Sequence, residues 1–261
     1  MARKKIAYYA AQLPVGPGQH LIMEWGEEEM VCLVKAEATG LVEAFEMFSY
    51  DKSSTDDWND IFYEIKTASA VFAKPYSKVT AYFNTVESIL VPEKLLTASS
   101  AEDYLNLVHG EQAHLEVKYD KLLSTKVFIN AYRIRKSLSE LLTRQFIIFQ
   151  SAHTYSALLN DVLRRPRLAP VFIKLQFYSK HFIVAFWKAE RLQMVQSFDF
   201  KGTEDVLYYL LRTLQQLGLN AAEAQLELSG MIDSHTKTYE QLAKLFPHLE
   251  TDKAPPNGVF E

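Results

Sequence analysis

Hydrophobic and polar residues alternate along three neighbouring stretches in the last third of the chain. These are residues 171–178, residues 182–187 and, more loosely, residues 193–200. A period of two is typical of β-strands with one buried face, and the short gaps predict a three-stranded meander. Over residues 203–217 the period becomes helical, with one apolar stripe that Gly218 ends.

The segment after this helix predicts one more strand, a turn and a closing helix. These elements are expected over residues 224–228, at Ser229-Gly230 and over residues 237–246. The complete order is strand, strand, strand, helix, strand, helix. Short strands alternating with helices are typical of an α/β fold.

The N-terminal half shows the same order. Strands are expected over residues 20–24, 30–36 and 41–49, a helix over 56–73 and a strand over 78–83. The helix would bury Trp58, Ile61, Phe62, Ile65 and either Ala68 or Ser69. We interpret the repeated order as an internal duplication, with chance similarity between two α/β halves as the alternative.

The first half carries additional elements before a basic linker. They are a strand over 86–91, a helix over 101–108, a hairpin over 115–122 and 126–132, a helix over 135–146, a buried strand over 147–150 and a helix over 155–163. Arg164-Arg165-Pro166-Arg167 is the clearest linker. The predicted organisation is an N-terminal arm (1–19), a first lobe (20–167), a second lobe (168–250) and a flexible tail (251–261).

Composition limits the functional classes. Hydrophobic residues make up 48% of the 261 residues, which is enough for a sizeable core. The net charge of −4 argues against a dedicated nucleic-acid binder. The single cysteine, Cys32, allows no intramolecular disulfide and is expected to be a buried small residue. No apolar run approaches the roughly 18 residues of a membrane span, so we expect a cytoplasmic protein.

Three segments resemble those of a Bacteroidota family known as domain of unknown function 3822. They are residues 78–92 (KVTAYFNTVESILVP), 126–133 (KVFINAYR) and 227–246 (ELSGMIDSHTKTYEQLAKLF). The lobe pattern also resembles the actin-like ATPase superfamily. The resemblance implies two RNase H-like lobes in an actin-like arrangement with a central cleft. It does not imply an activity, because one fold hosts many functions.

The superfamily places a phosphate loop at the first hairpin of each lobe, with glycines and a magnesium-ordering aspartate. Here the first hairpin has one glycine, Gly26, and then three successive glutamates that would repel a triphosphate. The second hairpin, residues 177–181, has neither Asp nor Gly. Only Lys180, Ser229 and Gly230 remain as candidate cofactor-binding residues, and we expect neither a catalytic residue nor a cofactor.

Other constellations favour structural roles. An RNase H-like nuclease needs a carboxylate cluster, whereas the corresponding strands offer Lys174 and a single Glu227 in the second lobe. His109 and His114 flank Glu111 at a spacing that could ligate a metal, but no further ligand is adjacent and surface histidines near glycine are common, so no metal site is predicted. Ser151-Ala152-His153 is expected to be a loop, and Asp233-Ser234-His235 a helix cap. A basic middle segment is expected to be a solvated helix face, with a surface for an acidic partner as the alternative: Arg133, Arg135, Lys136, Arg144, Arg164, Arg165 and Arg167.

These observations favour a pseudo-ATPase that acts as a protein-binding or assembly scaffold, with a protein partner or another copy of itself. The alternative is an enzyme that uses ATP and magnesium in the cleft through Lys180, Ser229 and Gly230. A weaker alternative is a nucleic-acid-associated factor that uses the basic middle segment.

Overall fold

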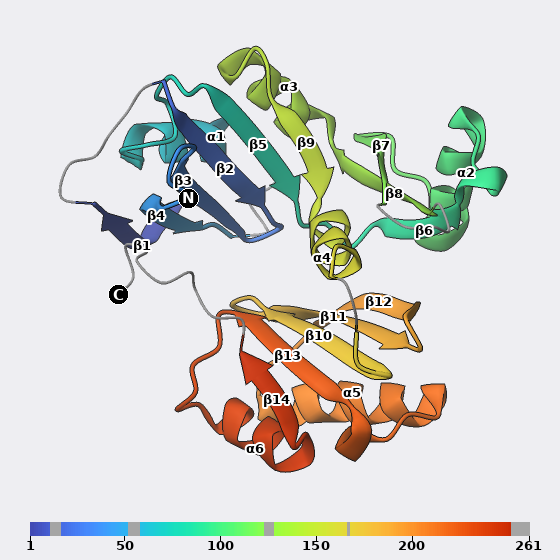
Figure 1. Ribbon diagram of the computed structural model, residues 1–261. Helices are drawn as coiled ribbons and strands as arrows, with labels where there is room; N and C mark the ends of the chain where they lie inside the picture. Colours follow the sequence, from blue (N-terminus) through green and yellow to red (C-terminus); the bar gives the residue numbers. More distant parts are fainter. Residues whose placement is uncertain (11–16, 52–57, 123–127, 166–167, 252–261) are drawn as a thin grey trace. The chain divides into compact units, whose positions relative to one another are not determined.

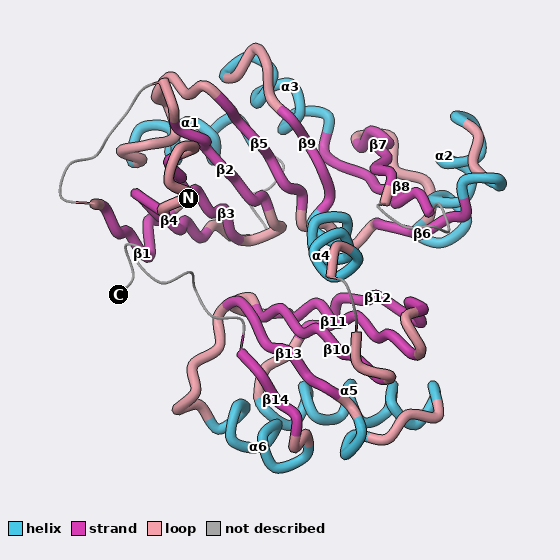
Figure 2. The backbone as a smooth tube through the Cα atoms, viewed as in Figure 1, coloured by secondary structure: helices cyan, strands magenta, loops and turns pink. Residues whose placement is uncertain are grey.

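The computed structural model describes residues 1–10, 17–51, 58–122, 128–165 and 168–251. These residues form two compact units, one ending at Leu163 and the other beginning at Arg164. Figures 1 and 2 show the elements of each unit. No helix in these described ranges is long and apolar enough to cross a lipid bilayer.

The first unit is built on a six-stranded sheet with the order β1-β4-β3-β2-β5-β9. The predicted meander is β2 (Gln19–Trp25), β3 (Glu29–Ala36) and β4 (Val42–Ser49), all antiparallel. Strands β5 (Lys78–Phe83) and β9 (Gln150–His153) extend it in parallel from β2. Helix α4 (Thr154–Leu163) follows β9 directly.

Helices α1 (Trp58–Ala68) and α3 (Lys136–Gln145) pack on one face of this sheet. The predicted apolar stripe of α1 is confirmed, because Trp58, Ile61, Phe62 and Ile65 are all buried in the core. Ala68 is exposed and Ser69 is half-buried. Each fully buried large apolar side chain stabilises the fold by about 1.5–3 kcal/mol. This core holds α1 and α3 against the sheet.

A smaller sheet is inserted between β5 and α3. It consists of β6 (Ser88–Pro92), β8 (Phe128–Arg135) and β7 (Leu115–Lys121), in the order β6-β8-β7. A short 3-10 turn, η2 (Glu93–Leu95), leads from β6 into α2 (Ala98–His109). Thr97 and Ser100 start α2 through a reciprocal capping box. Helix α2 buries Leu105 against this sheet.

The second unit repeats the topology of the first. Its elements are β10 (Val171–Phe177), β11 (His181–Lys188), β12 (Arg191–Asp199), α5 (Thr203–Leu217), η3 (Ala221–Glu223), β13 (Gln225–Gly230), α6 (Lys237–Leu245) and β14 (His248–Thr251). The strand order is β12-β11-β10-β13-β14. In both units, therefore, the first strand of the meander pairs in parallel with a fourth strand, and the fourth pairs in parallel with a fifth.

The predicted N-terminal arm contains a strand of the sheet, β1 (Arg3–Tyr9), which pairs antiparallel with β4. A buried carboxylate fastens it. Glu46 Oε1 accepts from Lys4 Nζ at 2.9 Å and from the Tyr9 hydroxyl at 2.5 Å. Ser69 Oγ and the Ala70 N–H also donate to Glu46. Burial opposes ionisation of Glu46, but these donors outweigh it and lower the pKa of the carboxyl.

The region after α3 differs from the prediction of a buried strand over 147–150. Ile147 and Ile148 are 90% and 87% exposed, and the strand begins only at Gln150. Consequently Ser151–His153, predicted as a loop, belongs to β9. A short apolar run does not itself reveal whether its residues are buried.

Two further differences concern the second unit. Ser229 and Gly230 end strand β13 rather than forming a separate turn, and residues 248–251 form a parallel edge strand that the sequence did not predict. The predicted tail from residue 252 and the hairpin turn Ser124-Thr125 lie outside the described residues.

Candidate functional site

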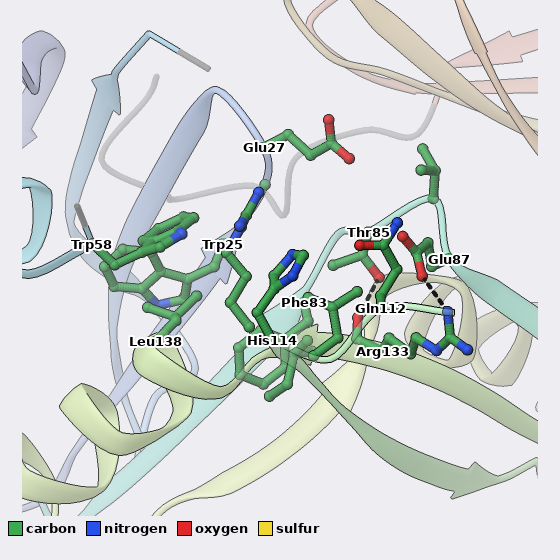
Figure 3. Close-up of a pocket in the computed structure, with 15 residues that line it drawn as sticks. Trp25, Glu27, Trp58, Phe83, Thr85, Glu87, Gln112, His114, Arg133 and Leu138 are labelled. Carbon is green, nitrogen blue, oxygen red and sulfur yellow. Dashed lines mark hydrogen bonds and ion pairs between the residues drawn. The ribbon is translucent and has the colours of Figure 1, made fainter. Parts of the chain in front are cut away.

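A cavity of about 380 Å³ opens in the first unit, where the large sheet meets the inserted small sheet. Five separate segments line it: the β2–β3 turn, the start of α1, the end of β5 with the loop that follows, the loop before β7, and the β8–α3 junction. Figure 3 shows the principal side chains. Small-molecule pockets of proteins typically have volumes of about 300–1,000 Å³.

The apolar side of the cavity is formed by two tryptophans with Phe83 and Leu138 (Figure 3). The rings of Trp25 and Trp58 meet edge to face with centroids 6.1 Å apart, and Trp25 stacks on Phe62 at 5.9 Å. Both tryptophans are at least 96% buried. Their indole Nε1 atoms are buried and have no hydrogen-bond partner among the described residues. A buried donor without an acceptor costs about 1–3 kcal/mol.

On the opposite side of the cavity, an ion pair ties β8 of the small sheet to the loop after β5 (Figure 3). Arg133 Nη1 donates to Glu87 Oε2 at 3.0 Å and to the Gly110 carbonyl at 2.7 Å, and Nη2 donates to Asn106 Oδ1. The Thr85 hydroxyl donates to the Arg133 carbonyl at 3.1 Å. Because Arg133 is only 3% exposed, these partners make it a structural cation.

The start of α3 forms a further part of the wall. Arg135, the residue that precedes the helix, lines the cavity and is half-buried. Lys136 fixes the neighbouring loop, since its N–H donates to the His114 carbonyl at 3.1 Å and its Nζ to the Ala113 carbonyl at 2.8 Å. In Figure 3 the His114 ring lies between Trp25 and the Glu87–Arg133 pair.

In the first hairpin turn, the position of the superfamily's phosphate loop, backbone groups are hydrogen-bonded to neighbouring residues of the same lobe. The Gly26 N–H donates to the Glu29 carbonyl at 2.8 Å. The buried Tyr50 hydroxyl donates to the Gly26 and Glu29 carbonyls at 2.6 and 3.0 Å. Burial, followed by the charges of Glu29 and Glu27, raises the pKa of Tyr50, which keeps this hydroxyl a donor.

The second hairpin turn holds Lys180, which is exposed between β10 and β11. The rings of Tyr178 and His181 stack at 4.5 Å across the turn, and the Tyr178 N–H donates to the His181 carbonyl. The other candidate residues, Ser229 and Gly230, end the adjacent strand β13, where Gly230 pairs with Phe177. The topology thus places the three candidates at one end of the second sheet.

Ser229 and Gly230 have evident structural roles there. The Ser229 hydroxyl donates to the Leu175 carbonyl at 3.2 Å. Gly230 has φ +81°, and a Cβ built on it would overlap the Phe177 carbonyl oxygen. Its lack of a side chain is required by the close approach of β10, as well as by its left-handed backbone.

At the positions compared with RNase H-like nucleases, the second unit holds a buried ion cluster. Glu227 accepts from Lys174 Nζ at 2.5 Å and from Arg165 Nη1 and Nη2 at 2.5 and 2.9 Å. Desolvation raises the pKa of Glu227, but Arg165 and Lys174 outweigh it and the net direction is down. A lone carboxylate that already has two cations provides no two-metal site.

The histidines considered as ligands do not converge. Among the described residues, no group of three His, Cys, Asp or Glu side chains could hold a metal ion. His153 is fully buried, and burial lowers its pKa to about 4. Its Nε2 lies 3.0 Å from the Thr85 carbonyl, and its Nδ1 accepts from the Tyr155 N–H at 3.0 Å. His153 is therefore a neutral residue of the core.

The basic middle segment is partly used inside the molecule. Arg133 pairs with Glu87, Arg144 with Glu140 and Arg165 with Glu227. Arg135 instead lines the cavity, a site that was not predicted. The residues that line the cavity come from segments far apart in the sequence. Of these residues, Trp58 was predicted only as part of the core.

Two units with one repeated topology define the actin-like ATPase fold, and comparison with solved structures agrees. A Bacteroides thetaiotaomicron protein with an actin-like ATPase fold and unknown function has a TM-score of 0.76 at 16% identity, covering 90% of this chain and 91% of that one. The chain belongs to the family described as "Protein of unknown function (DUF3822)", whose model matches residues 17–249. The resemblance noted in the sequence is thus confirmed.

Two more distant structures share the fold. The PilM-PilN type IV pilus biogenesis complex has a TM-score of 0.55 at 11% identity, covering 92% of this chain and 89% of that chain. The ethanolamine utilization protein EutJ from Carboxydothermus hydrogenoformans has a TM-score of 0.50 at 6% identity, covering 91% and 86%. None of the curated protein sequences matches the chain.

Proposed function

We propose that this chain is a scaffold of the actin-like ATPase fold that binds a protein partner through its first unit and uses no nucleotide cofactor. The partner is another protein or a second copy of the chain. The observation that carries the proposal is the pair of adjacent isoleucines after α3, which are 90% and 87% exposed. Single exposed apolar side chains are common, whereas contiguous apolar patches mark interaction sites.

A groove between α1 and α3 ends at a residue close in sequence to the isoleucine pair. Tyr63, Leu141 and Arg144 line this groove, together with Gln145, which lies two residues before Ile147. The Tyr63 side chain is 70% exposed. Aromatic side chains and arginine are enriched at protein interfaces, so this mixed surface suits a protein partner. The similar fold in the PilM-PilN complex supports the same kind of role.

The two hairpin turns support the absence of a nucleotide cofactor. In the first turn Gly26 is engaged by Glu29 and Tyr50, and glutamates 27–29 add negative charge. In the second turn a Tyr178–His181 stack occupies the position where glycines would let backbone N–H groups approach a phosphate. The rival proposal, a nucleotide-dependent enzyme, relies on Lys180, Ser229 and Gly230 lying at the same end of the second sheet.

The experiment compares three forms of the purified chain as bait and in light scattering. One is unchanged, one carries Ile147→Asp and Ile148→Asp, and one carries Leu107→Asp and Val108→Asp. Leu107 and Val108 are the matched control, because they form another adjacent exposed apolar pair, 83% and 60% exposed on α2 in the same unit. We expect the double variant to reduce the captured partner, or the dimer fraction, at least about tenfold, a change of about 1.4 kcal/mol. A strict monomer that captures nothing, or equal capture by all three forms, would refute the proposal.

A further inference from the structure

We infer that the cavity of the first unit is a binding site for a carboxylate attached to an apolar body about the size of one aromatic side chain. This inference goes beyond the proposed scaffold function and uses a different surface. It combines an apolar wall, a cation that has no partner in the described part of the chain, and the N-terminal end of a helix, all lining one cavity of about 380 Å³.

The apolar body is accounted for by Trp25, Trp58, Phe83 and Leu138, which line one side. The two indole Nε1 atoms are buried and have no acceptor among the described residues. Trp25 and Trp58 are only 1% and 4% exposed, so their N–H groups lie out of reach of a molecule in the cavity. This side of the cavity therefore favours apolar atoms of a ligand.

The charge of the ligand follows from Arg135 and the start of α3. The Arg135 side chain forms no ion pair or hydrogen bond with any residue of the described ranges. Helix α3 has neither a side-chain N-cap nor an acidic residue in its first turn. The helix dipole therefore leaves partial positive charge at its beginning, beside the guanidinium. His114 supplies a further possible donor next to the tryptophans (Figure 3).

The two acidic residues in the lining do not reverse this preference. Glu87 is neutralised by Arg133, with Oε2 and Nη1 3.0 Å apart. Glu27 comes from the hairpin turn, and its carboxylate extends away from the two indole rings in Figure 3. A cationic ligand would meet Arg135 and the helix dipole, which leaves an anion as the favoured occupant. A planar guanidinium binds a carboxylate in a bidentate manner, which makes this anion the best match.

An apolar carboxylate can be a free aromatic acid or the C-terminal residue of a peptide. Isothermal titration in a carboxylate-free buffer distinguishes the classes with matched probes. These are 3-phenylpropionate, 3-phenylpropanol and 3-phenylpropylamine, followed by acetyl-Ala-Ala-Phe with either a free or an amidated C-terminus. We expect the acid to bind at least about tenfold more tightly than the alcohol, and the amine not to bind. Preference for the free peptide over phenylpropionate would assign the peptide as the source.

Four variants locate the site. Arg135→Gln is expected to weaken binding of the acid at least about tenfold and leave the alcohol unchanged, whereas Arg135→Lys keeps the charge but not the bidentate geometry and is expected to give an intermediate loss. Trp58→Phe reduces the apolar wall and is expected to weaken the acid and the alcohol alike, by about two- to tenfold. Arg144→Gln, at the other end of α3, is the control and is expected to change nothing. Equal affinities for acid and alcohol, no binding of any probe, or equal effects of Arg135→Gln and Arg144→Gln would overturn the inference.

Discussion

Replacing Gly230 with alanine is expected to loosen the pairing between β10 and β13 in the second unit. Gly230 has φ +81°, and an added Cβ would lie 2.9 Å from the Phe177 nitrogen, 3.1 Å from its carbonyl carbon and closer still to the carbonyl oxygen. Non-bonded atoms prefer separations of about 3.5–4.0 Å. The backbone of one strand must therefore move.

The size of the effect follows from two contributions. A left-handed backbone at a non-glycine residue costs about 1–2 kcal/mol. Relieving the overlap costs about 1–3 kcal/mol, as overpacking does elsewhere, and it stretches the 2.9 Å hydrogen bond from the Met231 N–H to the Phe177 carbonyl. We expect a total loss of about 2–5 kcal/mol.

Gly218→Ala is the matched control, because Gly218 also has a positive φ, +61°, but a Cβ there meets nothing within 4 Å. That variant should lose only the backbone contribution, about 1–2 kcal/mol. Native-state hydrogen exchange of the β10 and β13 amides gives the local opening free energy for both variants. Equal losses would refute the steric argument. Any use of Gly230 variants to test nucleotide binding must take this structural damage into account.

Three other outcomes are expected. The pKa of the Glu46 carboxyl is lowered from its ordinary value of 4.5, so its ionised form stabilises the folded chain above that pH, and this stability is lost as the pH falls through the lower pKa of the folded state. Glu46→Gln should therefore flatten the pH dependence of the free energy of unfolding below about pH 4.5, and an unchanged slope would contradict this. Glu227→Ala, which removes the carboxylate beside the 3% exposed Lys174, should cost about 3–5 kcal/mol in denaturant unfolding, and a loss below about 1 kcal/mol would show that the pair is unimportant. Burial raises the pKa of the Cys32 thiol, so iodoacetamide should label it only in denaturant; rapid labelling of the native chain would be inconsistent with its position in the core.

The repeated topology was predictable because strand and helix periods are local signals. Helix α5 and strand β5 match the predicted residues, and the core stripe of α1 was identified. The signal weakened where burial depends on distant partners. The apolar run from Phe146 to Phe149 resembles a buried strand, but Ile147 and Ile148 form an exposed bend within it. Strand β14 has only four residues, too few to show a period.

The cavity could not be predicted for a related reason. It joins residues separated by more than a hundred positions, from Trp25 to Leu138, so no local spacing identifies it. Arg133 and Arg135 look alike in a basic stretch, and as residues i and i+2 of β8 they are expected on the same face. Arg133 is buried with Glu87, and Arg135 lines the cavity. Only the tertiary structure separates the neutralised cation from the available one.

Thermal melting with and without ATP and magnesium, with ADP as the control, tests most directly whether this protein is a scaffold without a nucleotide cofactor. A ligand at about 100 times its Kd adds about 2.7 kcal/mol of stability. For a chain of this size each kcal/mol raises Tm by about 2–4 °C. The scaffold proposal predicts no shift at millimolar nucleotide. A rise of several degrees with ATP and magnesium, abolished by Lys180→Ala, would contradict it and favour the nucleotide-dependent enzyme.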